Sequence, residues 1–139
     1  MRIIALDWGE RRVGVAISDG LGITAQPVEV INNGDYSIRI TRIRELIKDR
    51  EVKEIVIGMP FTLKGEIGCQ AKKVEFLAEK LRKEFRIPVH LQDERLSTKE
   101  VERQLISFDL SRGKRKKVRD KLAAQMILQT FLDRRNRTT

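Results

Sequence analysis

The sequence predicts an α/β fold built on a five-stranded mixed sheet with helices on both faces. Three observations lead to this prediction. The chain opens with three apolar runs, two helical patterns then alternate with two short apolar runs, and the remainder is mostly helical in pattern. With 139 residues, 40% of them hydrophobic, the chain is long enough for one domain with a sizeable core. We therefore expect residues 1–139 to form a single domain.

The first three apolar runs predict antiparallel strands. Arg2–Trp8 is almost continuously apolar up to Asp7, as is typical of a central strand covered on both faces. A four-residue turn separates it from Val13–Ser18, so the two runs predict a β-hairpin. Thr24–Ile31 predicts a third strand, and Pro27, which cannot donate a ladder hydrogen bond, favours an edge position for it.

Helices and strands alternate in the middle of the chain. Isoleucines at helical spacing predict an amphipathic helix over residues 35–50. A short buried strand is expected at 54–58 and a fifth strand at 88–91. Between them a second helix is predicted from its apolar face, Val74, Leu77, Ala78, Leu81 and Phe85. Strands linked by helices imply parallel pairing.

Two further helices are predicted after the fifth strand. Ser97 with Glu100 fits a capping box, so a helix is expected to run from there to about Ile106. After a basic loop, a last helix is expected near 117–134, with one apolar side formed by Leu122, Ala123, Met126, Ile127 and Phe131. This order of elements is that of the ribonuclease H-like fold.

Composition narrows the kind of site. The net charge is +9 and charged residues make up 35%, above the usual share of roughly 25%, which suits a surface that binds a polyanion but also a heat-adapted protein. The chain has one cysteine, Cys69, and one histidine, His90. These counts exclude an intrachain disulfide framework and a zinc site rich in cysteine or histidine. A bound metal would be held mainly by carboxylates, which favours Mg²⁺ or Mn²⁺. No apolar run approaches the roughly 18 residues that span a bilayer, so a cytoplasmic location is expected.

Acidic residues at the predicted strand and helix ends are the candidates for chemistry. Asp7 closes an apolar central strand, where an acid needs a cation, water or hydrogen bond to offset its desolvation. Asp93 and Glu94 follow the fifth strand; adjacent acids point opposite ways, so Glu94 is preferred and Asp93 is an additional candidate. Asp120 is expected in the first turn of the last helix, one turn before small residues that would let this helix approach Asp7.

Each acid also has an ordinary structural interpretation. Asp7 could cap the turn that follows it, the acids at 93 and 94 could form surface ion pairs, and Asp120 could interact with the helix dipole. Together, however, three carboxylates could bind two divalent ions, one activating water and the other stabilising the leaving oxygen of a phosphodiester.

A basic segment follows the predicted helix near Ser97. Seven of the ten residues from Arg112 to Lys121 are basic and only Asp120 is acidic, which favours contact with nucleic-acid phosphates, although a merely solubilising loop is the alternative. The candidate phosphate-binding residues are Arg11, Arg12, Lys64, Arg95, Arg112, Lys114, Arg115, Lys116, Lys117 and Arg119.

Four motifs resemble a known family in the same order along the chain. They are the opening Asp7-Trp8-Gly9-Glu10-Arg11-Arg12-Val13-Gly14-Val15-Ala16; Gly58-Met59-Pro60 with Gly65; Asp93-Glu94-Arg95-Leu96-Ser97-Thr98; and Asp120-Lys121-Leu122-Ala123-Ala124 with Ile127-Leu128-Gln129. This pattern resembles the YqgF (RuvX-type) family of bacterial ribonuclease H-like proteins, which are described as Holliday-junction resolvases and as nucleases of precursor 16S ribosomal RNA. The resemblance implies a metal-dependent nuclease in which Asp7, Glu94 and Asp120 are the catalytic acids.

Three functional hypotheses follow. The leading one is a two-metal endonuclease that uses Mg²⁺ or Mn²⁺ and matures precursor 16S rRNA, with resolution of branched DNA as the alternative substrate. The second is a nucleic-acid-binding module without catalysis, since fold does not fix function. The third is an actin-like or sugar-kinase-like ATPase. It is disfavoured, because such proteins need two lobes to close around a nucleotide and this chain is long enough for only one. We expect a monomer or a weak homodimer; a resolvase acts as a pair because it cuts two symmetric strands.

Overall fold

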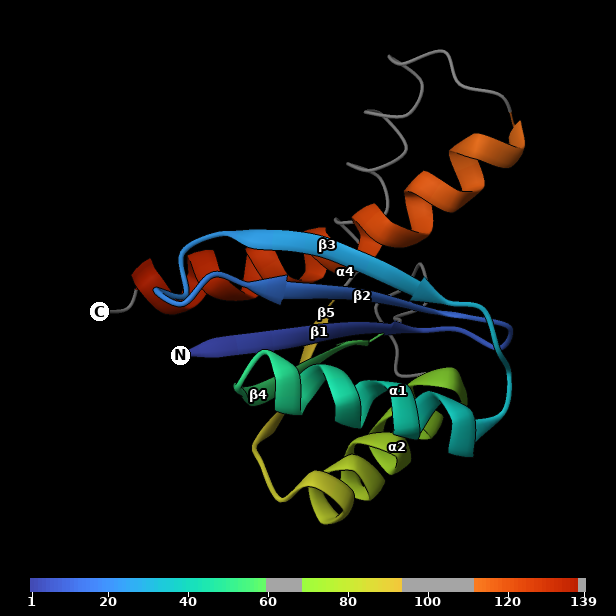
Figure 1. Ribbon diagram of the computed structural model, residues 1–139, viewed down its shortest axis with the longest axis horizontal. Helices are drawn as coiled ribbons and strands as arrows, with labels where there is room; N and C mark the ends of the chain where they lie inside the picture. The colour runs from blue at the N-terminus through green and yellow to red at the C-terminus, as the bar shows by residue number, and fades with distance from the viewer. Residues whose placement is uncertain (60–68, 94–111, 138–139) are drawn as a thin grey trace.

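The structure is a computed structural model that describes residues 1–59, 69–93 and 112–137. Within these ranges one five-stranded sheet carries three helices (Figure 1). The strands are β1 (Arg2–Trp8), β2 (Val13–Ser18), β3 (Ala25–Ile31), β4 (Val52–Met59) and β5 (Val89–Asp93). The helices are α1 (Tyr36–Asp49), α2 (Cys69–Phe85) and α4 (Arg112–Arg137), and none of the three is long and apolar enough to cross a membrane.

Strand pairing confirms the predicted mixed sheet. The strand order is β3-β2-β1-β4-β5, with β1 antiparallel to β2, β2 antiparallel to β3, and both β1–β4 and β4–β5 parallel. β3, which contains Pro27, lies at an edge as predicted. The first helix also begins as expected, because the Asp35 carboxylate accepts a hydrogen bond of 3.1 Å from the backbone N–H of Ile38.

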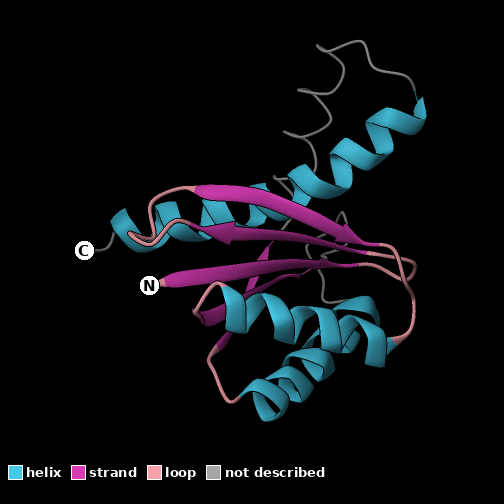
Figure 2. Cartoon of the chain, viewed as in Figure 1, coloured by secondary structure: helices cyan, strands magenta, loops and turns pink. Residues whose placement is uncertain are grey.

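The sheet separates two apolar cores. Along β1, Ile4 and Leu6 belong to the core beneath α1 and α2, whereas Ile3 and Ala5 belong to the core beneath α4. Figure 2 shows the corresponding layers, with α1 and α2 on one face of the sheet and α4 on the other. Because side chains alternate along a strand, the Asp7 side chain points to the face of the sheet that α4 covers. The next residue, Trp8, packs against the core beneath α1 and α2.

The last helix differs from its prediction in length and in its buried side. α4 begins at Arg112, so the stretch expected to be a basic loop is helical, and Asp120 lies in the third turn rather than the first. Arginine and lysine are good helix formers, which allows the basic stretch to extend the helix. Among the described side chains of α4, residues 122–137, the fully buried ones are Ala124, Ile127, Leu128 and Leu132; of the predicted apolar side only Ile127 is among them. The helix predicted near residues 97–106 lies outside the described residues.

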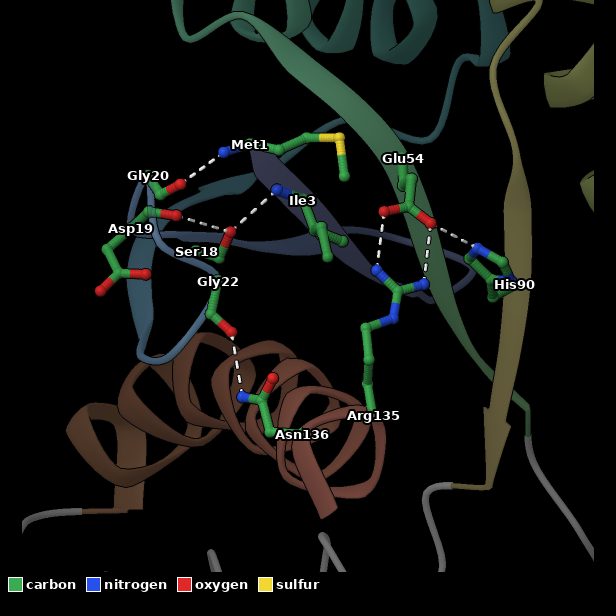
Figure 3. A network of polar contacts seen from close by, with 10 residues as sticks. All are labelled: Met1, Ile3, Ser18, Asp19, Gly20, Gly22, Glu54, His90, Arg135 and Asn136. Atoms are coloured by element: carbon green, nitrogen blue, oxygen red, sulfur yellow. Dashed lines mark hydrogen bonds and ion pairs between the residues drawn. The ribbon is translucent and has the colours of Figure 1, made fainter. Parts of the chain in front are cut away.

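An ion pair attaches the end of α4 to the sheet. Both terminal nitrogens of Arg135 donate to the carboxylate oxygens of Glu54 on β4, each at 2.8 Å, and His90 Nε2 on β5 lies 2.8 Å from the same carboxylate (Figure 3). The His90 ring also packs against Phe131, with 5.1 Å between ring centres. The hydrogen bonds from Arg135, followed by that from His90, lower the pKa of Glu54 from 4.5 to about 2.

Acid is expected to weaken this attachment. Since the pKa of Glu54 is lowered on folding, its stabilising contribution is complete above pH 4.5 and is lost as the pH falls toward about 2. Between about pH 6 and about pH 3, wild type should lose about 1–2 kcal/mol more unfolding free energy than Glu54→Gln, whose amide does not titrate. Urea denaturation at both pH values measures the difference. Equal losses in the two proteins would show that Glu54 is not the responsible group.

Candidate metal centre

Asp7 lies near the C-terminal end of the central strand. It is half-buried and continues the side of β1 that faces α4. Because β1, β4 and β5 run parallel, the C-terminal ends of all three strands meet at one edge of the sheet. This is the edge at which open α/β sheets build their sites.

Glycines flank Asp7 on both neighbouring strands. Gly14 of β2 is its direct partner, and Gly58 of β4 follows the residue that pairs with Leu6. Gly58 in turn pairs with the buried Gln92 of β5. The residues that flank Asp7 on β2 and β4 are thus glycines, which bring no side chain of their own to this position of the sheet.

The other predicted acids are described only in part. Asp93 ends β5 at the same edge, where its backbone pairs with that of Met59. Asp120 lies on α4, four residues before Ala124, which is fully buried in the core that contains Ala5. The side chains of Asp93 and Asp120, and the whole of Glu94, lie outside the described part of the structure.

The described polar contacts of α4 lie toward the end of the sheet opposite to Asp7. Near the end of the helix, Arg135 contacts Glu54, which pairs with Ile3 at the end of β1 away from Asp7. Gln125 donates to the carbonyl oxygen of Ala25, which pairs with Ser18 at that same end of the sheet. Among the described residues, no group of three acidic, histidine or cysteine side chains is placed to hold a metal ion, so the three-acid site stays a prediction.

Arg39 of α1 fixes the turn that follows Asp7 and Trp8, a role not predicted from the sequence. Its side chain is only 2% exposed and donates to the carbonyl oxygens of Gly9 at 2.8 Å, Glu10 at 3.0 Å and Asn33 at 2.5 Å. The guanidinium also lies 4.9 Å from the centre of the Trp8 ring, and burial lowers the pKa of Arg39. The available sequence signal was its spacing from the buried Ile43 and Leu46, which puts Arg39 on the inner side of the helix.

The predicted phosphate-binding residues fall into two described groups. Arg11, exposed, and Arg12, half-buried, lie in the β1–β2 turn beside Asp7. Arg112, Lys114, Arg115, Lys116, Lys117 and Arg119 lie on the first turns of α4, the orange part of the helix that extends away from the sheet in Figure 1; their side chains are outside the described part. Lys64 and Arg95 lie outside the described residues.

Adding a methyl group to Gly9 is expected to strain this turn. The N–H of Gly9 donates to the carbonyl oxygen of Arg12 at 2.9 Å, and a Cβ at position 9 would lie 3.0 Å from that same oxygen. Gly9→Ala should therefore lower the unfolding free energy by about 1 kcal/mol. Gly20→Ala is the matched control, because a Cβ there meets nothing within 4 Å. Chemical denaturation of both variants compares them; equal stability would mean that the turn adapts to the methyl group.

Solved structures share this architecture. The chain superposes on Thermus thermophilus RuvC bound to a Holliday junction with a TM-score of 0.57 and 17% identity, covering 100% of this chain and 98% of that chain. The fowlpox virus resolvase bound to Holliday junction DNA gives a TM-score of 0.58 at 13% identity, covering 96% and 98%. The fold is thus that of the ribonuclease H-like resolvases.

Sequence comparison gives the family. The model of the RuvX family, described as Holliday junction resolvase, matches residues 1–134. A protein of Geobacillus kaustophilus is 49% identical over 137 residues, covering 96% of this chain and 98% of the relative, and one of Halothermothrix orenii is 49% identical over 137 residues, covering 99% and 98%; both are named "Putative pre-16S rRNA nuclease". The chain belongs to the RuvX family, which confirms the resemblance found in its motifs.

Proposed function

We propose that this protein is a metal-dependent endonuclease that cuts structured nucleic acid, with precursor 16S ribosomal RNA as its substrate. The observation that carries the proposal is the position of Asp7, half-buried at the C-terminal edge of the central strand and flanked by the glycines of β2 and β4, in a RuvX-family chain. Full-length relatives near 49% identity that are named as pre-16S rRNA nucleases favour RNA as the substrate.

Three carboxylates would hold the metal: those of Asp7, Glu94 and Asp120, with Asp93 as an additional candidate. Oxygen ligands suit Mg²⁺ or Mn²⁺, and the glycines that flank Asp7 add no side chains of their own at this position. Glu94 is two residues after Gln92 in the sequence, and Asp120 lies four residues before Ala124, which belongs to the core on the Ala5 face of the sheet. Two bound ions would supply an activated water and stabilise the leaving oxygen.

The other residues of the proposal bind and position the substrate. The arginines of the β1–β2 turn and the basic first turns of α4 would neutralise phosphates on either side of the scissile bond, as would Lys64 and Arg95. Arg39 would hold the turn, and thereby the end of β1, in a fixed position. In this proposal the whole chain is one nuclease domain that acts in the cytoplasm.

Branched DNA is the second candidate substrate. The description of the family and the resolvase fold both favour it. A four-way junction requires two symmetric cuts and hence a pair of active sites, whereas trimming a single RNA strand requires one. A monomer, or a homodimer too weak to persist at working concentration, would favour RNA.

Cleavage assays test both candidates. A precursor 16S rRNA fragment and a synthetic four-way junction would each be incubated with the protein in Mg²⁺, in Mn²⁺ or with a chelator. We expect metal-dependent cuts within the RNA precursor and at most weak cutting of the junction. Symmetric cutting of the junction alone would establish the second candidate instead. Salt-sensitive binding without cleavage of either substrate would reduce the protein to a nucleic-acid-binding module.

A further inference from the structure

A pocket of about 400 Å³ opens on the face of the sheet that α1 and α2 cover, the face opposite to the one toward which Asp7 points. Among the described residues, its walls come from the end of β1, the β1–β2 turn, the start of α1 and one side of α2: Trp8, Gly9, Glu10, Gly34, Arg39, Lys73, Val74 and Leu77. Val74 and Leu77 are buried and form apolar wall, whereas Lys73 is exposed. The described lining thus combines an aromatic ring, two cations, one acid and apolar surface.

Aromatic and cationic side chains continue around the pocket. The Tyr36 ring lies 6.1 Å from that of Trp8, and Lys80 Nζ lies 3.9 Å from the centre of Tyr36, so α1 and α2 are joined across this rim. On α2, Phe76 is not part of the described lining, but it is 68% exposed and its ring centre lies 5.8 Å from the same Lys80 Nζ, which places it beside this rim. The sequence alone left Tyr36 and Trp8 unconnected.

The chemistry of this lining matches one nucleotide. Bases stack on aromatic side chains in a manner that tolerates any sequence, and lysine neutralises phosphate. The volume falls within the range of small-molecule sites, roughly 300–1,000 Å³. Arg39 is already bound to three backbone carbonyls, so it serves as a rigid wall, and Lys73 is the exposed cation available to a phosphate.

The pocket lies at the same sheet edge as the proposed metal centre. Trp8 directly follows Asp7 in β1, and the two residues point to opposite sides of the sheet. Both sites therefore lie at one end of β1, and a strand of nucleic acid held at Asp7 would reach the pocket by passing over this edge of the sheet.

We infer that this pocket binds a single unstacked base, with its phosphate, from the nucleic-acid strand that occupies the Asp7 edge. The inference rests on the proposed function for the identity of that strand. The pocket then fixes the register of the substrate by holding a nucleotide next to the one that is cut. A free mononucleotide offers the same base and phosphate, and the experiment separates these two sources.

Trp8 is the only tryptophan of the chain, so its fluorescence reports on the pocket. In the presence of a chelator, which prevents cleavage, the protein would be titrated with a single-stranded oligoribonucleotide of about ten nucleotides. This length is chosen to span one binding site for a single strand. We expect quenching of Trp8, with affinity reduced about fivefold in Lys73→Ala and about tenfold in Phe76→Ala. Adenosine monophosphate should bind at least about a hundredfold more weakly, because it lacks the contacts made by the rest of the strand.

Matched controls lie away from the pocket. Lys83→Ala removes an exposed lysine of α2 ten residues beyond Lys73, and Leu21→Ala removes an apolar side chain that is 82% exposed in the β2–β3 turn. Losses of affinity in these controls equal to those at positions 73 and 76 would overturn the inference, as would a mononucleotide that binds as tightly as the oligonucleotide.

Cleavage assays keep this inference distinct from the proposed function. Unchanged oligonucleotide binding in Lys73→Ala and Phe76→Ala, together with metal-dependent cleavage that requires Asp7, would reject the pocket and leave the nuclease in place. Loss of binding in the two pocket variants, in a protein whose cleavage does not depend on Asp7, would support the pocket and reject the metal centre.

Discussion

Replacement of Asp7 by asparagine is expected to reduce nucleic-acid cleavage at least about a hundredfold, the scale of losing one group that stabilises the transition state electrostatically. Asparagine has nearly the same size as aspartate but lacks the negative charge that a divalent ion requires. The residues that flank Asp7 on β2 and β4 are glycines, so neither of them offers a carboxylate in its place. Single-turnover cleavage of the preferred substrate measures the effect.

Folding and binding should survive this change. Asparagine keeps the size of the side chain and one of its oxygen acceptors, so the fold should be retained, as should affinity for the substrate in chelator. Asp49→Asn is the matched control, an identical change at an exposed position near the end of α1. Equal cleavage by wild type and Asp7→Asn would rule out Asp7 as a metal ligand.

Replacement of Arg39 by alanine is expected to lower the unfolding free energy by about 3 kcal/mol. The change removes three hydrogen bonds to carbonyl oxygens at positions 9, 10 and 33, together with the contact on the Trp8 ring. These carbonyls belong to two loops that Arg39 holds to α1. Urea denaturation measures the loss, and near-ultraviolet circular dichroism should show that the Trp8 environment changes.

Two further variants distinguish the effect of the planar hydrogen-bond donors of the guanidinium from the effect of its charge. Arg39→Lys keeps the charge but lacks the planar arrangement of donors, so it should lose more than half of the stability that alanine loses. Arg134→Ala removes an exposed helical arginine and should stay within about 0.5 kcal/mol of wild type. Full stability in Arg39→Lys would show that charge on the Trp8 ring, and not the three hydrogen bonds, is what matters.

The sheet was predictable because its signals are local. Each strand carries its own apolar run, Pro27 marks the edge, and helix-linked runs imply parallel neighbours. The start of α4 was not predictable in this way, because arginine and lysine are equally common in helices and in solvated loops. Its buried side was also ambiguous, since apolar residues occur on more than one side between Leu122 and Leu132.

Only the part of the candidate site that lies on a single strand was predictable from the sequence. Asp7 could be identified because an acid at the end of a buried strand is unusual. Apart from the Asn33 contact of Arg39, the roles of Arg39, Glu54 and His90 depend on partners between 29 and 81 residues away, and no local spacing reveals such pairs. Trp8 and Tyr36 likewise meet only because α1 folds back across the end of β1.

The C-terminal position of α4 also has a consequence for synthesis on the ribosome. In the described structure, the residues that cover the second core come from α4, and Gln129 bonds to Ala25 across 104 positions of sequence. During synthesis, the apolar face of the sheet that forms this core therefore stays exposed to solvent until α4 has been translated. A nascent polypeptide that still lacks α4 should thus be prone to aggregation.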